Sequence, residues 1–302
     1  MITPTLRRNV TAVWAEAGER WLATLPATLA AIAADWSLTV GDPFDLSYHY
    51  VTAVTLADGG QAVLKLGVPG GGSLAEEAPA LAAFDGRGAV RLQRADLDRG
   101  ALLLERALPG HRVRDLPDAE ATSAAVAVMR QLHAPAAAVL PDVLTQVRAF
   151  DGYLARFPDG GPLPRSHVTT AAGLMRELCA SATSRVLLHG DLHHDNVLSA
   201  TRAPWLAIDP HGLTGDPSYE AGSWLFNPDP DDRDPALTAL VPGRLEQLAD
   251  ELGHPLDRLV AWGFVKAVMS DVWTAENWTP GATWSPASRA LDVADLLRPA
   301  LS

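Results

Sequence analysis

Eight residues in the middle of the chain, 189-HGDLHHDN-196, hold three histidines, two aspartates and one asparagine between two aliphatic runs. A further aspartate, Asp209, follows Asn196 by thirteen residues and ends the aliphatic stretch 205-WLAI-208. A carboxylate can take a proton from an attacking hydroxyl group, and carboxylate and amide oxygens are preferred ligands of hard divalent cations. The residue types of this region therefore indicate an active site, with two chemistries to choose between.

The first chemistry is metal-dependent hydrolysis. Side chains that can bind a metal are dense in this region: His189, Asp191, His193, His194, Asp195 and His211. Zinc hydrolases use such side chains, but the spacing here does not match their helical H-E-x-x-H arrangement. Hydrolysis would also leave the first third of the chain without a role, so it is the less favoured alternative. For His193 and His194 alone, hydrogen bonds to the backbone of the loop are the simpler role.

The second chemistry is phosphoryl transfer. Protein kinases use a loop H-R-D-x-x-x-x-N, whose aspartate receives the proton of the substrate hydroxyl and whose asparagine binds magnesium. Asp191 and Asn196 have the same separation, and His189 precedes Asp191 by two residues, as in that loop. Asp209 stands where kinases place another magnesium-binding carboxylate. The pattern therefore favours phosphoryl transfer over hydrolysis.

The first third of the chain offers the other half of such a site. Lys65 lies in the middle of the predicted strand 61–67, where a kinase holds the α- and β-phosphates of its nucleotide. Glu76 and Glu77 lie on the helix predicted to follow, and either can pair with Lys65. Lys266 is the only other lysine, in a chain whose basic residues are otherwise arginine. This bias suggests that a compact ammonium group is needed at the two lysine positions.

The predicted elements divide the chain near residue 107. Strands are expected at 47–56, 61–67, 88–96 and 101–107, with helices at about 9–35 and 74–86. Helices dominate afterwards, at about 118–134, 142–156, 167–181, 217–226, 235–252, 255–275 and 286–299, with short β runs at 186–188, 196–198 and 205–208. We therefore predict an α+β, bilobal, protein-kinase-like fold. A small β-rich N-lobe (1–106) binds the nucleotide, and a larger helical C-lobe (107–302) carries the catalytic loop and the metal and acceptor sites.

Composition limits the partners of the protein. The formal net charge of −12 argues against a general nucleic-acid binder, which needs a basic face, and agrees with a cationic ligand. The single cysteine, Cys179, rules out an internal disulfide and fits a reducing compartment. The apolar stretch 22–36 is too short to span a membrane, and the N-terminus lacks the pattern of a signal peptide. We therefore expect a cytoplasmic protein without a membrane partner, as a monomer or homodimer.

The motif H-G-D-L-H-H-x-N-V-L, followed by the I-D-P strand end, resembles the aminoglycoside phosphotransferases and their choline-kinase and homoserine-kinase relatives. Within them, 77-EAPALAAFDGRGAVRLQRAD-96, 102-LLLERALPG-110 and 208-IDPHGLTGDPSYEAGSWLFNP-228 resemble the aminoglycoside/hydroxyurea kinase group, of the streptomycin 6-phosphotransferase type. The resemblance covers about residues 45–230. It implies a bilobal fold that uses ATP and Mg²⁺ to phosphorylate a hydroxyl group of a small molecule.

The same resemblance implies roles for individual residues. Asp191 is then the catalytic base, and Asn196 and Asp209 are the magnesium ligands. Lys65 binds the phosphates of the nucleotide, and Glu77, at the start of the matching run, orients Lys65.

The segment 103-LLERAL-108 corresponds to the hinge, where Glu105 and Ala107 offer backbone groups to the adenine base. The loop 42–51 departs from the family because it lacks the glycines that usually let the backbone approach the phosphates. This departure leaves the preference for ATP over GTP open.

Four side chains are predicted to meet the acceptor: Glu220, Asp271, Trp273 and Glu276. Glu220 stands where many relatives have aspartate, a change that keeps the charge. A cationic aminocyclitol needs carboxylates and aromatic faces near the catalytic base. An ordinary acidic helix face with a packed tryptophan explains the residues of 270–278 equally well.

We therefore expect an ATP- and Mg²⁺-dependent O-phosphotransferase that acts on a small cationic molecule. A streptomycin-type aminoglycoside is the favoured acceptor, which makes the reaction one of antibiotic inactivation. A kinase of the same fold for hydroxyurea, a choline-like molecule or a sugar is the alternative. A catalytically silent nucleotide-binding scaffold is disfavoured by the intact set of Lys65, Asp191, Asn196 and Asp209.

Overall fold

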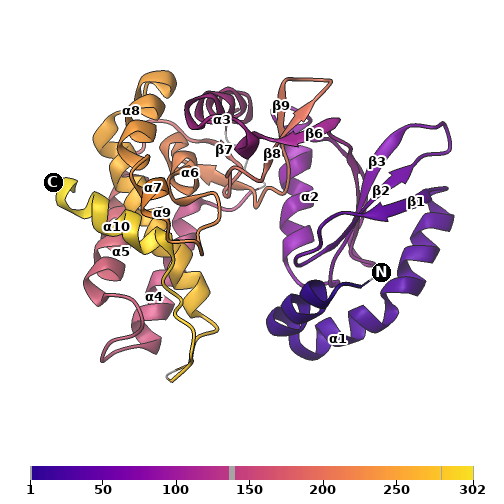
Figure 1. Cartoon of the computed structure of the whole chain (residues 1–302), viewed down its shortest axis with the longest axis horizontal. Helices are drawn as coiled ribbons and strands as arrows, with labels where there is room; N and C mark the ends of the chain where they lie inside the picture. The colour runs from indigo at the N-terminus through magenta and orange to yellow at the C-terminus, as the bar shows by residue number, and fades with distance from the viewer. Residues whose placement is uncertain (1, 136–139, 280, 302) are drawn as a thin grey trace.

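The computed structural model describes residues 2–135, 140–279 and 281–301 and contains two lobes that lie side by side (Figure 1). The N-lobe is built around one β-sheet, and the C-lobe is mainly helical. The α+β, bilobal fold predicted from the sequence is confirmed. Within the described ranges no helix combines the length and the apolar character that a membrane crossing requires.

The N-lobe sheet is antiparallel, with five strands in the order β1–β2–β3–β5–β4. Helix α1 (Pro4–Asp35) packs on one face of the sheet, and helix α2 (Ser73–Phe84) lies against the other. The strands are β1 Thr39–Pro43, β2 Tyr50–Thr55, β3 Gln61–Leu66, β4 Leu92–Asp96 and β5 Ala101–Glu105.

Strand β3 shows why Lys65 faces the site. Leu64 and Leu66 are fully buried in the apolar cluster that α1 forms with the sheet. Successive side chains of a strand alternate between its two faces, so Lys65 points to the opposite face, toward α2. The alternation of one short strand therefore directs the lysine toward Glu77 on that helix.

The chain leaves the N-lobe between β5 and β6 (Pro109–Arg112), and β6 pairs with β8 (Val197–Ala200) of the C-lobe. Strand β9 (Trp205–Ala207) completes this three-stranded sheet. A second connection between the lobes is a backbone hydrogen bond, which the Val90 N–H donates to the Ala207 carbonyl at 2.9 Å. The boundary predicted between residues 106 and 107 lies between β5 and β6, and it stays a prediction.

Helix α9 (Leu256–Ala275) forms the centre of the C-lobe and packs against α5, α6 and α10. It is apolar on nearly all sides, as expected of a helix buried inside a domain. The short strands β7 (Val186–Leu188) and β10 (Leu213–Gly215) pair with each other. The other helices are α3 Asp118–Leu132, α4 Val147–Arg156, α5 Arg165–Ala180, α6 Gly222–Phe226, α7 Pro235–Thr238, α8 Val241–Leu252 and α10 Arg289–Leu297.

Several predicted elements differ in detail. The helix predicted over 235–252 is two helices, α7 and α8, because Pro242 cannot donate a hydrogen bond inside a helix and occupies the first turn of α8 instead. The helix predicted over 217–226 starts as a 3₁₀ turn at Pro217. Strand β1 was not predicted, because its residues are mostly exposed and give no alternating apolar pattern.

Candidate active site

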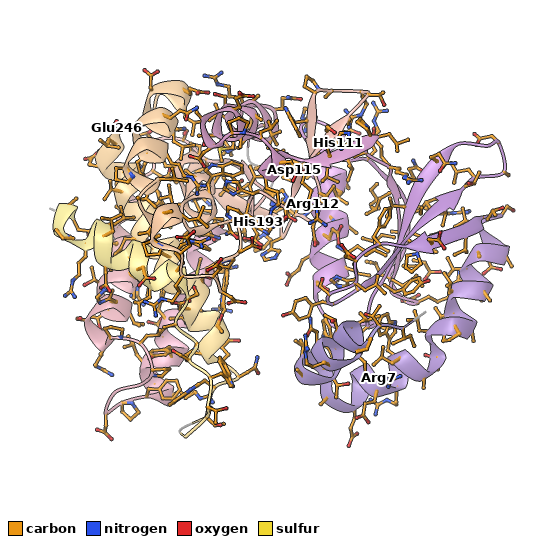
Figure 2. All side chains as sticks on the ribbon, viewed as in Figure 1. Arg7, His111, Arg112, Asp115, His193 and Glu246 are labelled. Carbon is orange, nitrogen blue, oxygen red and sulfur yellow. The ribbon has the colours of Figure 1, made fainter. Side chains whose placement is uncertain are left out.

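The catalytic loop, defined here as His189–Asn196, connects β7 to β8 where the two lobes meet. Arg112 of β6, which Figure 2 labels together with His193 of this loop, has its Nη1 3.6 Å from Asp195 Oδ1. Gly190 has a φ of 89°, a left-handed conformation that favours glycine. His189 fixes the start of the loop, because its Nε2 donates to the Ile208 carbonyl at 2.8 Å. The loop is thereby attached to the segment that ends in Asp209.

Lys65 lies between two carboxylates. Its Nζ is 2.6 Å from Glu77 Oε2 and 2.6 Å from Asp209 Oδ1. Burial acts to lower the pKa of Lys65, but the charges of Asp209 and Glu77 outweigh it and raise the pKa above its ordinary value. The choice of Glu77 over Glu76 is consistent with this geometry. The lysine is therefore cationic and held in one place, as a phosphate-binding group must be.

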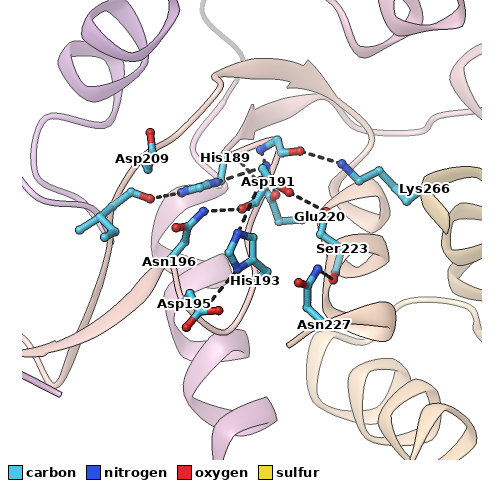
Figure 3. A network of polar contacts seen from close by, with 12 residues as sticks. His189, Asp191, His193, Asp195, Asn196, Asp209, Glu220, Ser223, Asn227 and Lys266 are labelled. Carbon is cyan, nitrogen blue, oxygen red and sulfur yellow. Dashed lines mark hydrogen bonds and ion pairs between the residues drawn. The ribbon is translucent and has the colours of Figure 1, made fainter. Parts of the chain in front are cut away.

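Asp191 is a partly exposed carboxylate of the catalytic loop. Its side chain is 31% exposed, and Ser223 Oγ donates to its Oδ1 at 3.3 Å (Figure 3). Burial acts to raise the pKa of Asp191, but the nearby His193 and Lys266 outweigh it and hold the pKa below its ordinary value. An ionised and partly exposed carboxylate is suited to take a proton from a hydroxyl group.

Asn196 directly precedes β8 and Asp209 follows β9, and the two ends are joined because the Ile208 N–H donates to the Asn196 carbonyl at 2.9 Å. The amide nitrogen of Asn196 donates to the Asp191 carbonyl at 3.0 Å. In the described part of the chain no hydrogen bond reaches the Asn196 amide oxygen, and the Asp209 side chain is half-exposed. One amide oxygen and one carboxylate fit Mg²⁺, which takes few protein ligands and keeps several waters.

The histidines of the loop do not form a shared metal site. No group of three His, Cys, Asp or Glu side chains that could hold a metal ion occurs in residues 2–135, 140–279 and 281–301. His189 binds the Ile208 carbonyl, and His193 Nδ1 accepts the Asp195 N–H at 3.2 Å. The predicted backbone role is therefore right for His193, and the hydrolase alternative is left without a ligand set.

The Glu220 carboxylate accepts hydrogen bonds from the backbone of the catalytic loop. Its side chain is 1% exposed and accepts the N–H groups of His189 and Gly190 at 2.5 and 3.0 Å. Burial raises the pKa of Glu220 to about 7, against the opposing effect of these two donors. Both carboxylate oxygens are engaged by the backbone, which favours a supporting role over the acceptor contact predicted from the sequence.

Replacing Glu220 by glutamine is expected to lower the free energy of unfolding by about 2 kcal/mol, because the amide has one acceptor oxygen for the two buried N–H groups, so one of these groups loses its partner. Urea denaturation of the two proteins measures this difference. Glu276→Gln is the matched control, since Glu276 is exposed and its stability effect is expected to be negligible. Equal stabilities of the two variants would contradict the supporting role of Glu220.

The other three residues predicted to contact the acceptor differ in their exposure to solvent. Asp271 is 1% exposed and accepts the Ser288 hydroxyl at 2.7 Å, and burial raises its pKa to about 6. Trp273 is half-buried, and Glu276 is exposed near the end of α9. Asp271 therefore binds Ser288, the residue that precedes α10. Contacts of Trp273 and Glu276 with the acceptor stay predictions.

The predicted hinge lies at the end of β5. The Glu105 side chain accepts two hydrogen bonds from Arg202, at 2.8 and 2.9 Å, and its backbone N–H donates to the Arg91 carbonyl at 2.8 Å. Among the described residues nothing accepts a hydrogen bond from the Ala107 N–H. Ala107 is thus the better placed of the two to offer a backbone donor to a base.

His194 was assigned a backbone hydrogen bond from the sequence, and this assignment is wrong. The residue is 2% exposed, and neither of its ring nitrogens has a partner among the described residues. Its ring stacks on Trp224 with 3.6 Å between the ring centroids. Burial, aided by the nearby Arg244, lowers the pKa of His194 to about 2. The imidazole therefore acts as a neutral aromatic ring that packs the loop against α6.

This pKa makes stability depend on pH. Below pH 6.5 the unfolded chain gains a proton on His194 that the folded protein does not accept, so stability falls as the pH falls. Between pH 7.5 and pH 5 this one residue is expected to cost about 2 kcal/mol. His194→Phe keeps the stack and removes the titration, so its stability is expected to decline less over this range. Denaturation curves at several pH values test this, and parallel declines for both proteins would refute it.

Two functional side chains were missed by the sequence reasoning. Ser223 contacts Asp191, and Arg114 joins Asp195 of the catalytic loop, at 3.1 Å, to Asp229 of the acidic loop after α6. A signal for Ser223 was present, because it follows Glu220 by three residues and so lies on the same side of a helical turn. Arginines are too frequent in this chain for Arg114 to have been noticed.

Comparison with known proteins gives one family and several relatives. The family described as aminoglycoside/hydroxyurea antibiotic resistance kinase matches residues 36–277. The chain is 35% identical over 271 residues to hydroxyurea phosphotransferase of Kitasatospora aureofaciens, covering 86% of this chain and 76% of that protein. It is 30% identical over 318 residues to streptomycin 6-kinase of Streptomyces glaucescens, covering 98% and 97%. Choline kinase LicA from Streptococcus pneumoniae, also solved in complex with AMP, matches with a TM-score of 0.64 at 12% identity over 92% of this chain and 99% of that chain, a likeness of fold alone.

Proposed function

Because the chain belongs to the aminoglycoside/hydroxyurea antibiotic resistance kinase family, we propose that it transfers the γ-phosphoryl group of ATP to a hydroxyl group of a streptomycin-type aminoglycoside. The chain is a phosphotransferase, as its family and its relatives show. The observation that carries the proposal is the arrangement of Lys65, Asp191, Asn196 and Asp209 around the catalytic loop.

In the proposed reaction the oxygen of the acceptor hydroxyl attacks the γ-phosphorus of ATP, and Asp191 receives the proton of that hydroxyl. The phosphoryl group passes directly to the acceptor, and ADP leaves without a phosphorylated enzyme. Lys65 stabilises the negative charge of the nucleotide phosphates, and Glu77 holds Lys65 in place. Mg²⁺, when bound by Asn196 and Asp209, supplies further positive charge to the phosphate oxygens.

An adenine nucleotide is supported by two observations. The Ala107 N–H has no intramolecular acceptor among the described residues, which suits a hydrogen bond to a base. LicA, which shares the fold, binds AMP. A cationic acceptor is supported by the net charge of −12 and by the 30% identity to a streptomycin 6-kinase.

Hydroxyurea is the second candidate acceptor. The identity of 35% to a hydroxyurea phosphotransferase favours it, although that match covers less of either chain than the streptomycin 6-kinase match. Hydroxyurea is small and uncharged, so it would gain nothing from the acidic character of the protein.

The test is ADP release by the purified protein with ATP and Mg²⁺, against streptomycin, kanamycin, hydroxyurea, choline and homoserine. We expect stimulation by streptomycin, with a phosphate ester of streptomycin identified by mass spectrometry. Stimulation by hydroxyurea alone would replace the proposed acceptor by the second candidate. Stimulation by choline or homoserine alone would contradict both.

A further inference from the structure

Lys266 of helix α9 contacts the backbone of the catalytic loop. It is 2% exposed, and its Nζ donates to the Gly190 carbonyl at 2.8 Å (Figure 3). The Tyr219 hydroxyl lies 3.3 Å from the same nitrogen. The ring centroids of Tyr219 and Trp273 lie 4.7 and 5.6 Å from it. One carbonyl, one hydroxyl and two aromatic faces thus surround a buried ammonium group.

A buried lysine of this kind is costly for folding. Within the described residues no carboxylate oxygen lies within 4.0 Å of its Nζ, so the ammonium group has no direct ion pair. Removing an ammonium group from water is unfavourable, and hydrogen bonds and aromatic faces offset this only in part. An apolar side chain of similar size would avoid the cost. The stability of α9 alone therefore does not account for a lysine here.

Helices α6 and α9 pack so closely at Lys266 that the Cβ and Cγ atoms of this residue leave room only for glycine at position 222. A Cβ atom on Gly222 would lie 2.5 Å from Lys266 Cγ and 2.6 Å from Lys266 Cβ. Gly222 is the first residue of α6, where alanine would otherwise be the better helix former. The chain thus accepts a less stable helix start at the place where the lysine passes toward the loop.

The contacts of Glu220 and Lys266 hold three consecutive peptide groups at the start of the catalytic loop. Glu220 holds the N–H groups of His189 and Gly190, and Lys266 holds the Gly190 carbonyl, which belongs to the peptide that joins Gly190 to Asp191. Glycine restrains its own backbone less than any other residue, so the orientation of this peptide depends on its two hydrogen bonds: the Asp191 N–H donates to His189 Nδ1 at 3.3 Å, and the Gly190 carbonyl accepts from Lys266. The orientation of the peptide in turn sets where the Asp191 side chain begins.

We propose that Lys266 is a positioning residue for phosphoryl transfer, which fixes the Gly190–Asp191 peptide and thereby aims the Asp191 carboxylate at the acceptor hydroxyl. The inference rests on the proposed function, because it takes Asp191 as the base. It also accounts for the composition of the chain: the two lysines are buried, one against Glu77 and Asp209 and the other against the catalytic loop, where a slim side chain with a compact charge fits.

The test compares Lys266→Met with Lys266→Gln, two variants of similar size of which only the glutamine retains an N–H donor for the Gly190 carbonyl. Val265→Ala is the control for a lesion of α9, since Val265 is buried next to Lys266 in the sequence. We expect Lys266→Met to lower kcat about 100-fold and to leave the Kd for ATP within about threefold. Lys266→Gln is expected to recover about tenfold of that loss, whereas Val265→Ala changes stability and leaves kcat near the wild-type value.

Hydrogen exchange in the protein without substrates separates this inference from the proposed function. We expect the amides of residues 189–192 to exchange faster in Lys266→Met than in Val265→Ala. A wild-type protein that phosphorylates no acceptor would overturn the proposed function, while the exchange result would still test the contact. Equal exchange and equal kcat in Lys266→Met and Val265→Ala would overturn the role of Lys266. Should Lys266→Met not fold, Gly222→Ala displaces the lysine without removing it, and unchanged exchange of the loop in that variant would overturn the role as well.

Discussion

Replacing Asp191 by asparagine is expected to lower kcat by about 10³-fold while leaving the Kd for ATP within about threefold of the wild-type value. The amide has the size of the carboxylate and can keep the hydrogen bond from Ser223, so the loop retains its shape. It has no basicity, so the hydroxyl proton of the acceptor has no recipient. Steady-state kinetics with the acceptor and calorimetry with ATP measure the two effects separately.

Asp195→Asn is the matched control, because it removes the same charge from the same loop. Asp195 pairs with Arg112 and Arg114 and lies away from the proton to be transferred. We expect its effect on kcat to be at least about tenfold smaller than that of Asp191→Asn. Comparable losses in both variants would mean that loop charge in general, and no single base, supports the reaction.

The placement of Lys65 and of the catalytic-loop side chains could be predicted because it depends on short-range patterns. Asp191 and Asn196 belong to one loop, so their spacing alone limits where they can lie. Lys65 faces α2 because strand residues alternate, and the buried Leu64 and Leu66 fix which face is which. These relations are local, and a single sequence contains them.

The acceptor half could not be predicted in the same way. Glu220 binds backbone N–H groups some thirty residues earlier, and Asp271 binds Ser288 seventeen residues later. The type of a carboxylate residue does not indicate whether it faces a ligand or an unpaired N–H group of its own chain. His194 shows the same limit, since its neutral, stacked ring resembles a metal ligand as long as only its residue type is known.

The composition held a signal that neither the motif nor the spacing contained. Two lysines among 24 basic residues indicate positions at which arginine was unsuitable. Both lie in the site, one against Glu77 and Asp209 and the other against the Gly190 carbonyl. The second contact joins a helix near the end of the chain to the loop, a relation that only the fold discloses.

The contact between Lys65 and Asp209 leads to the second prediction of large effect. Lys65 Nζ and Asp209 Oδ1 are 2.6 Å apart, so a nucleotide phosphate that binds Lys65 must compete with the Asp209 carboxylate. Asp209 has a φ of 60°, a conformation that asparagine tolerates and alanine does not favour. Asp209→Asn therefore removes one negative charge without straining the backbone, and Lys65 stays held by Glu77.

We expect Asp209→Asn to weaken the binding of ATP about 10- to 100-fold when Mg²⁺ is present, because the carboxylate that binds the metal is lost. Without Mg²⁺ the affinity for ATP is expected to change less than about threefold or to rise, since Lys65 loses a competing anion. Calorimetric titrations with ATP in excess Mg²⁺ and in EDTA give both values. Lys65→Met is the complementary variant, expected to weaken binding under both conditions because its charge acts on the phosphates directly. Mg²⁺ should increase the affinity for ATP, and this increase should shrink when the carboxylate that binds the ion is removed. An Asp209→Asn protein that retains wild-type affinity in Mg²⁺ would therefore show that another group holds the metal.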